Sequence, residues 1–177
     1  MKILMVSDLH ISNNWNKYLK IFLNRIDKIF DVINHESSAT EELTVVMCGD
    51  VVDKGKIRYY NVAIQIFEYI KQKAGDRHIE FIMVPGNHDL NPNCGFKAFD
   101  DFCEKYQYGV GAFDKGSCYS KIVNPFNFIL SNSAYHKATK YGQVDTEAII
   151  NNVNPSYIVK PKSIDFMGFY LNSYLYN

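Results

Sequence analysis

The chain has 177 residues, of which 47% are hydrophobic, so it can bury a sizeable core in one globular domain and is not intrinsically disordered. The chain has 19 lysine and arginine residues and 19 aspartate and glutamate residues, so its net charge is zero. This balance does not indicate a nucleic-acid partner, but it does not exclude one. No stretch approaches the roughly 18 apolar residues of a membrane span. We therefore expect no membrane partner.

The four cysteines form no Cys-x-x-Cys pair, which argues against a structural zinc site. Free thiols suit a reducing compartment, and the apolar start of the chain is too short for a signal peptide. These two observations predict a cytoplasmic protein.

The first half of the chain alternates strands with helices. Amphipathic helices are predicted from Trp15 to about Ser37 and from Tyr59 to about Gly75, because apolar residues recur there at helical spacing. Successive strand–loop–helix units predict an α/β fold with a mostly parallel central sheet and flanking helices. Three short apolar runs with β-branched members are the predicted strands: residues 2–7, 43–49 and 78–84.

The second half is less regular. A helix is predicted over residues 96–106, and Asn124-Pro125 separates two runs that predict an antiparallel pair. For the aromatic-rich end of the chain no element is predicted. We therefore divide the chain into one domain over residues 1–160 and a tail over 161–177. The remaining expectations are strands at 118–123, 126–130 and 157–159, a loop at 131–143 and a short helix at 144–152.

Each of the three predicted parallel strands ends in polar side chains. Ligands of parallel sheets bind beyond the carboxyl ends of the strands, where these side chains would meet. Carboxylate, imidazole and amide oxygen groups are ligands for divalent cations, so the pattern predicts a metal site. The motifs are Asp8-x-His10, Gly49-Asp50-x-x-Asp53 and Gly86-Asn87-His88-Asp89.

Each residue alone also has a simpler interpretation. Asp8 and Asp53 could cap a turn or a helix, Asn87 could be a turn residue, and His88 could be a surface histidine. Their joint occurrence at three strand ends favours a site. For Asp89, a role supporting the site and a role stabilising the turn both stay open. The other histidines (His35, His78 and His136) are interpreted as surface or loop residues.

Taken together, the three motifs resemble the calcineurin-like metallophosphoesterase superfamily over about residues 1–145. The resemblance implies a four-layer α/β/β/α sandwich and a hydrolase that acts on phosphomonoesters or phosphodiesters. It also implies two divalent metals, Mn, Fe or Zn, bridged by a hydroxide that attacks phosphorus. Asp8, His10 and Asp50 match the ligands of the first metal. Asp50 and Asn87 match ligands of the second.

Three further positions match by the same resemblance. His88 corresponds to the imidazole that protonates the leaving alkoxide, and Asp53 to the carboxylate that orients it. Lys54 stands where many family members carry an arginine that binds the substrate phosphate.

The family pattern continues with a histidine-bearing strand and a Gly-His-x-His loop, and neither occurs in this chain, where no histidine follows His136. Lys160 and Lys162 stand about where these imidazoles would be. We therefore expect a weak second metal site, an incomplete second sheet and little activity of this chain alone. Two alternatives remain: a truncated or degenerate non-catalytic fragment, and a site completed by a partner chain.

Overall fold

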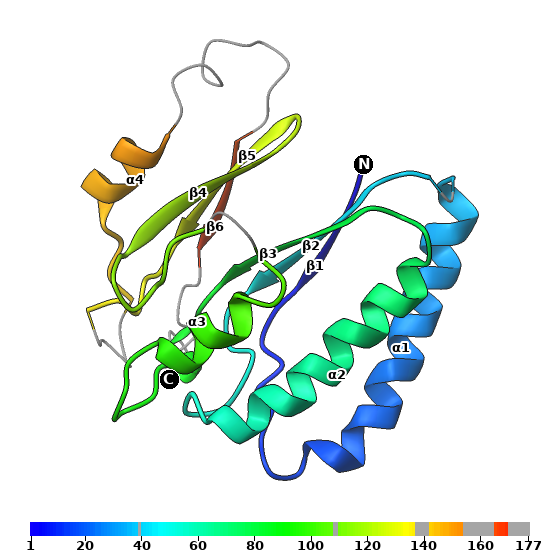
Figure 1. The fold of residues 1–177 in the computed structure, drawn as a ribbon, viewed down its shortest axis with the longest axis horizontal. Helices are drawn as coiled ribbons and strands as arrows, with labels where there is room; N and C mark the ends of the chain where they lie inside the picture. The colour runs from blue at the N-terminus through cyan, green and yellow to red at the C-terminus, as the bar shows by residue number, and fades with distance from the viewer. Residues whose placement is uncertain (39, 108–109, 137–141, 154–164, 170–177) are drawn as a thin grey trace, which may run out of the picture.

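The structure is a computed structural model, and it describes the chain except residues 39, 108–109, 137–141, 154–164 and 170–177 (Figure 1). The elements in chain order are β1 (Lys2–Val6), α1 (Trp15–Glu36), β2 (Leu43–Cys48), α2 (Ile57–Ala74), β3 (Ile79–Val84), the 3-10 turn η1 (Asn87–Asp89), α3 (Lys97–Cys103), β4 (Cys118–Val123), β5 (Phe126–Ser131), α4 (Thr146–Asn152) and β6 (Asp165–Phe169).

The first sheet has the strand order β1-β2-β3, and both strand pairs are parallel. The central strand β2 is buried along nearly its whole length, which explains its uninterrupted apolar sequence. Helices α1 and α2 lie side by side against one face of this sheet (Figure 1). The three strands and two helices predicted for this half of the chain are confirmed.

The second sheet covers the opposite face of the first. Strands β4 and β5 form the predicted antiparallel pair, and β6 adds a parallel partner to β5. Phe128 and Leu130 on β5 face the main core, whereas Ile129 packs with Cys118 and Ile149 beneath α4. The layers therefore run helix, sheet, sheet, helix (Figure 1), which confirms the predicted fold class.

Strand β6 falls in the aromatic-rich stretch for which the sequence predicted no element. The strand predicted at 157–159 and the domain boundary predicted after residue 160 both lie outside the described residues. Within the part of the chain that is described, no helix has both the length and the apolar character that crossing a bilayer requires. All four cysteines are free thiols.

Two helices are shorter than predicted, and local hydrogen bonds explain one of them. Helix α3 ends at Cys103, beyond which the chain forms turns. Helix α4 begins at Thr146 because the Asp145 carboxylate accepts a hydrogen bond from the Ala148 N–H at 2.9 Å, which makes Asp145 the N-cap.

The core of the first layer is centred on Phe67 of α2, which has no exposed surface. Its ring centroid lies 5.0 Å from that of Phe81 on β3, 5.1 Å from that of Phe102 on α3 and 5.1 Å from that of Tyr106. These contacts join two helices to the central sheet, and aromatic pairs add stability beyond the area they bury.

Replacing Phe67 by alanine should lower the free energy of unfolding by about 3–5 kcal/mol, because the large cavity cannot collapse between three ring contacts. Ile57 on the same helix is 67% exposed, and Ile57→Ala should change stability by no more than about 0.5 kcal/mol. Urea denaturation followed by circular dichroism measures both. Similar losses for the two variants would contradict the central position of Phe67.

Candidate active site

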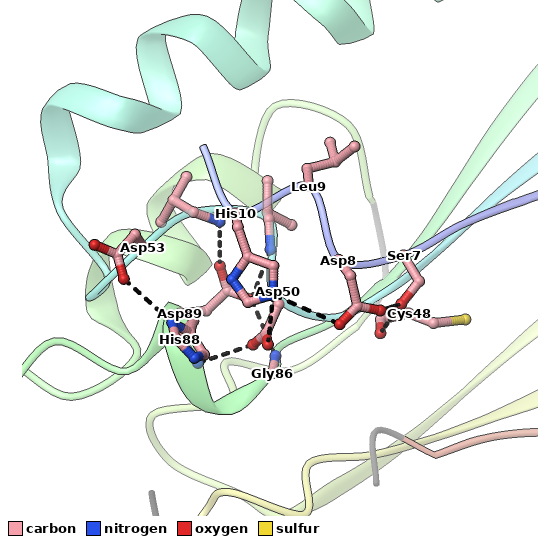
Figure 2. A network of polar contacts seen from close by, with 12 residues as sticks. Ser7, Asp8, Leu9, His10, Cys48, Asp50, Asp53, Gly86, His88 and Asp89 are labelled. Carbon is pink, nitrogen blue, oxygen red and sulfur yellow. Dashed lines mark hydrogen bonds and ion pairs between the residues drawn. The ribbon is translucent and has the colours of Figure 1, made fainter. Parts of the chain in front are cut away.

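The predicted site residues lie on three loops at the carboxyl ends of the parallel strands. Figure 2 shows Asp8 and His10 on the loop after β1, Asp50 and Asp53 on the loop after β2, and His88 on the turn after β3. The parallel topology thus brings together segments that are far apart in the sequence.

Backbone hydrogen bonds join the first two loops to each other. The Asp8 N–H donates to the Gly49 carbonyl at 3.2 Å, and the His10 N–H donates to the Asp50 carbonyl at 2.9 Å. The Ile11 N–H continues this ladder to Val51 at 3.1 Å. Pairing between the two segments therefore extends beyond the ends of β1 and β2 and keeps Asp8 and His10 beside Asp50.

Three of the predicted ligands have left-handed backbone conformations, with φ of 56° at Asp8, 45° at His10 and 51° at Asp50. A side chain in this region costs about 1–2 kcal/mol, although aspartate and histidine tolerate it better than most residues. Strain of this kind is concentrated at functional sites in proteins. Lys54 shares it, with φ of 58°.

The third loop reaches the site because Gly86 has no side chain. A Cβ atom at this position would lie 2.1 Å from Oδ1 of Asp50, so only glycine allows the turn to pack against that carboxylate. The His88 N–H then donates to the same Oδ1 at 2.8 Å. Glycine is therefore required at this position because a Cβ atom would not fit, and not because of an unusual φ.

Asp89 lies beneath the site and is fully buried. Its Oδ2 accepts hydrogen bonds from the N–H groups of Val51 and Gly86, while its Oδ1 accepts from the Val52 N–H and the Tyr60 hydroxyl, at 3.0–3.2 Å. Burial raises the pKa of Asp89 to about 7, against the lowering effect of the N–H donors. The carboxylate joins the second loop, the third loop and α2, so it supports the site.

The side chains above Asp89 form a compact group of metal-type ligands. His10 Nε2 lies 3.6 Å from Oδ1 of Asp8 and 3.5 Å from Oδ2 of Asp50. His10, Asp50 and His88 each offer one ligand atom, and these atoms lie within 4.8 Å of one another. The two imidazole rings meet edge to face, with centroids 4.5 Å apart. This donor set fits a divalent cation such as Zn²⁺, Mn²⁺ or Fe²⁺.

His88 also pairs with Asp53. Its Nδ1 lies 3.2 Å from Oδ1 of Asp53. Because a carboxylate accepts hydrogen bonds, this contact places a proton on Nδ1 and fixes the orientation of the ring. The same imidazole thus belongs to the ligand group and to a carboxylate–imidazole pair, whereas the resemblance assigned it only the second role.

The two remaining predicted residues are Asn87 and Lys54. Asn87 is buried in η1 between Gly86 and His88. Lys54 is exposed and makes no hydrogen bond or ion pair with a described residue. One residue that the sequence analysis missed is Trp15, whose indole N–H donates to the Leu9 carbonyl at 2.9 Å and so anchors the loop between Asp8 and His10.

A comparison with known families was decisive. The model of the calcineurin-like phosphoesterase family matches residues 1–169. The chain belongs to this family. The resemblance drawn from the three motifs is thereby confirmed, and the match extends beyond residue 145, into β6.

One curated relative is a probable cyclic nucleotide phosphodiesterase from Xenorhabdus bovienii (strain SS-2004). The two sequences are 30% identical over 98 residues, which cover 52% of this chain and 36% of the relative. The chain therefore matches little more than a third of the length of that relative.

All five histidines are described, and only two of them lie in the ligand group. His78 pairs with Glu80 at 3.3 Å on the surface, as expected for a histidine outside the motifs. His136 lies next to Tyr135 on the loop after β5. This member of the calcineurin-like phosphoesterase family therefore supplies its candidate site with His10 and His88.

The left-handed conformation at Asp8 predicts that Asp8→Gly is more stable than Asp8→Ala by about 1 kcal/mol in metal-free protein. Both variants remove the carboxylate, so the difference isolates the backbone strain. In helix α1 the order should reverse, with Asp31→Gly less stable than Asp31→Ala by about 1 kcal/mol. Urea denaturation in the presence of a chelator measures all four variants, and equal stability of the two Asp8 variants would contradict the prediction.

Proposed function

We propose that this chain is a metal-dependent phosphoesterase that hydrolyses phosphodiesters, with His88 as the general acid. The observation that carries the proposal is the Asp53–His88 pair beside the His10–Asp50–His88 ligand group. Membership of the calcineurin-like phosphoesterase family supports the reaction class. The similarity to a probable cyclic nucleotide phosphodiesterase favours diesters over monoesters.

We assign the first metal to Asp8, His10 and Asp50, and a second metal to Asp50 and Asn87. Bound cations there would supply positive charge for the phosphate oxygens and a water of lowered pKa. Mn, Fe and Zn all suit oxygen and imidazole ligands of this kind. Asp50 can serve both positions because its carboxylate has two oxygens and is held by the His88 N–H.

Side chains of this chain protonate the leaving group and contact the phosphate. Asp53 orients the His88 ring through Nδ1, which leaves Nε2 as the nitrogen that can give a proton to the leaving alkoxide. Asp53 also stabilises the protonated imidazole. Lys54, exposed on the same loop, offers a mobile positive charge to a phosphate oxygen, without the two-pronged geometry of arginine.

A second candidate function is a weakly active or non-catalytic metal-binding domain, alone or completed by a partner chain. The supporting observation is that three of the five histidines lie outside the ligand group. This leaves the second metal with fewer protein ligands than the first.

Four free thiols favour a reducing compartment, so we place the protein in the cytosol.

The ligand count predicts closer to one metal per chain than two. Elemental analysis after incubation with Mn²⁺ and dialysis should show this value, and Asp50→Asn should lower it to near zero because both assigned positions lose a ligand. Asp76→Asn, an exposed aspartate in the turn after α2, is the matched control and should keep the metal. Two tightly bound metals, or none even with excess Mn²⁺, would contradict the ligand assignment.

The role of His88 predicts a loss of activity that depends on the leaving group. With an alkyl phosphodiester, His88→Ala should lower kcat by about 10²–10⁴-fold, because an alkoxide must be protonated as it leaves. With bis-(nitrophenyl) phosphate the loss should be smaller, since nitrophenolate is a stable anion. His78→Ala, which changes the surface histidine paired with Glu80, should leave both rates unchanged.

Steady-state rates with Mn²⁺ for both substrates decide the matter. An equal loss for the two leaving groups would show that His88 acts as a metal ligand and not as the acid. Turnover that survives both His88→Ala and Asp50→Asn would show that the hydrolysis does not use this site, which favours the non-catalytic alternative.

A further inference from the structure

A cavity of about 270 Å³ adjoins the loop that carries His88, and the proposed reaction uses none of its walls. Three segments form it: the loop after η1, the turn before β4 and the loop after β5. The described residues that line it are Leu90, Gly95, Phe96, Asp114, Tyr135 and His136.

Hydrogen bonds fix this cavity relative to the candidate catalytic pair. The Gly55 N–H donates to the His88 carbonyl at 2.7 Å, and the Asn91 side chain donates to the Gly55 carbonyl at 3.0 Å. Asn91 and Gly95 then pair through two backbone hydrogen bonds of 2.9 and 3.0 Å. The wall that begins at Leu90 is thus attached to the loops that present Asp53 and His88.

Half of the residues that line the cavity carry an aromatic ring. Phe96 is buried, while Tyr135 and His136 meet edge to face with ring centroids 5.4 Å apart. Aromatic side chains bind planar rings by stacking, and nucleobases are planar rings of this kind. The volume lies just under the usual range for drug-sized ligands, so it suits one flat ring system.

Asp114 places a hydrogen-bond acceptor at this aromatic surface. Its Oδ1 accepts from the Phe96 N–H at 3.0 Å, and Gly95, with φ of 62°, allows the close approach because a Cβ would lie 2.1 Å from that oxygen. Asp100 holds the backbone of the turn by accepting from the N–H groups of Phe113 and Asp114 at 2.8 and 2.9 Å. The carboxylate is therefore held in place.

The second oxygen, Oδ2 of Asp114, makes no hydrogen bond to a described residue and can accept one from a ligand. A carboxylate acceptor favours the amino group on a base edge, as carried by adenine, cytosine and guanine, over uracil and thymine, which offer only a ring N–H as a donor. It also repels a second phosphate. The cavity therefore suits a neutral, amino-bearing ring and not a further anionic group.

We propose that this cavity binds the nucleobase of the substrate, so that the preferred substrates are phosphoesters of amino-bearing nucleosides. The inference rests on the proposed phosphoesterase function and adds to it the class of leaving group. Tyr135, beside His136, supplies the stacking surface, and Asp114 selects among bases.

Inhibition of bis-(nitrophenyl) phosphate hydrolysis by product analogues tests this. Adenosine 5′-monophosphate should inhibit about tenfold or more strongly than ribose 5-phosphate, which has the phosphate and sugar but no base. Tyr135→Ala should remove that difference, and Asp114→Asn should reduce the preference for the adenine nucleotide over the uracil nucleotide. Tyr18→Ala, at an exposed tyrosine of α1, should change neither ratio.

Equal inhibition by adenosine 5′-monophosphate and ribose 5-phosphate would overturn the nucleobase site and leave the phosphoesterase proposal standing. Saturation-transfer NMR with adenosine covers the case of an inactive chain, since adenosine binding needs neither metal nor turnover. Binding of adenosine that is lost in Tyr135→Ala supports the cavity even if hydrolysis is absent. No saturation transfer to adenosine from the wild-type protein overturns it.

Discussion

The buried carboxylate of Asp89 is the interaction on which the arrangement of the site depends. One side chain satisfies three backbone N–H groups and a tyrosine hydroxyl that would otherwise be buried without partners. Two of those N–H groups belong to the loop that carries Asp50 and one to the turn that carries His88. Asp89 therefore sets the spacing between these two site residues without facing a ligand itself.

The fold was largely predictable because its first half is repetitive. Buried parallel strands are uninterrupted apolar runs in the sequence, and amphipathic helices show apolar residues with a 3.6-residue period. The alternation of strands and helices along the chain then determines the topology. Strand β6 was not predictable in this way, because it pairs beside β5 in a mixed sheet and its sequence carries no period that separates it from its aromatic neighbours.

For the site, the sequence predicted which residues converge but not how they are supported. His10 and Asp50 do come together, since strand ends in a parallel sheet must. Tyr60 appeared only as one apolar position of a helix, although its hydroxyl donates to Asp89. Trp15 appeared as the start of a helix, although it anchors the first loop. Such partners are missed because they act through hydrogen bonds between residues that no local pattern links.

The place of β1 in the sheet has a consequence for the exchange of an ion at the proposed metal site. Among the described strands β1 pairs only with β2, and it is less buried than that central neighbour. Opening of an edge strand costs less free energy than opening of a central one. A brief separation of β1 would withdraw Asp8 and His10 together while Asp50 and His88 stayed in place. Exchange of an ion bound at the proposed metal site would then be limited by fraying at one edge of the sheet, and amide hydrogen exchange along Lys2–Val6 would report the same motion.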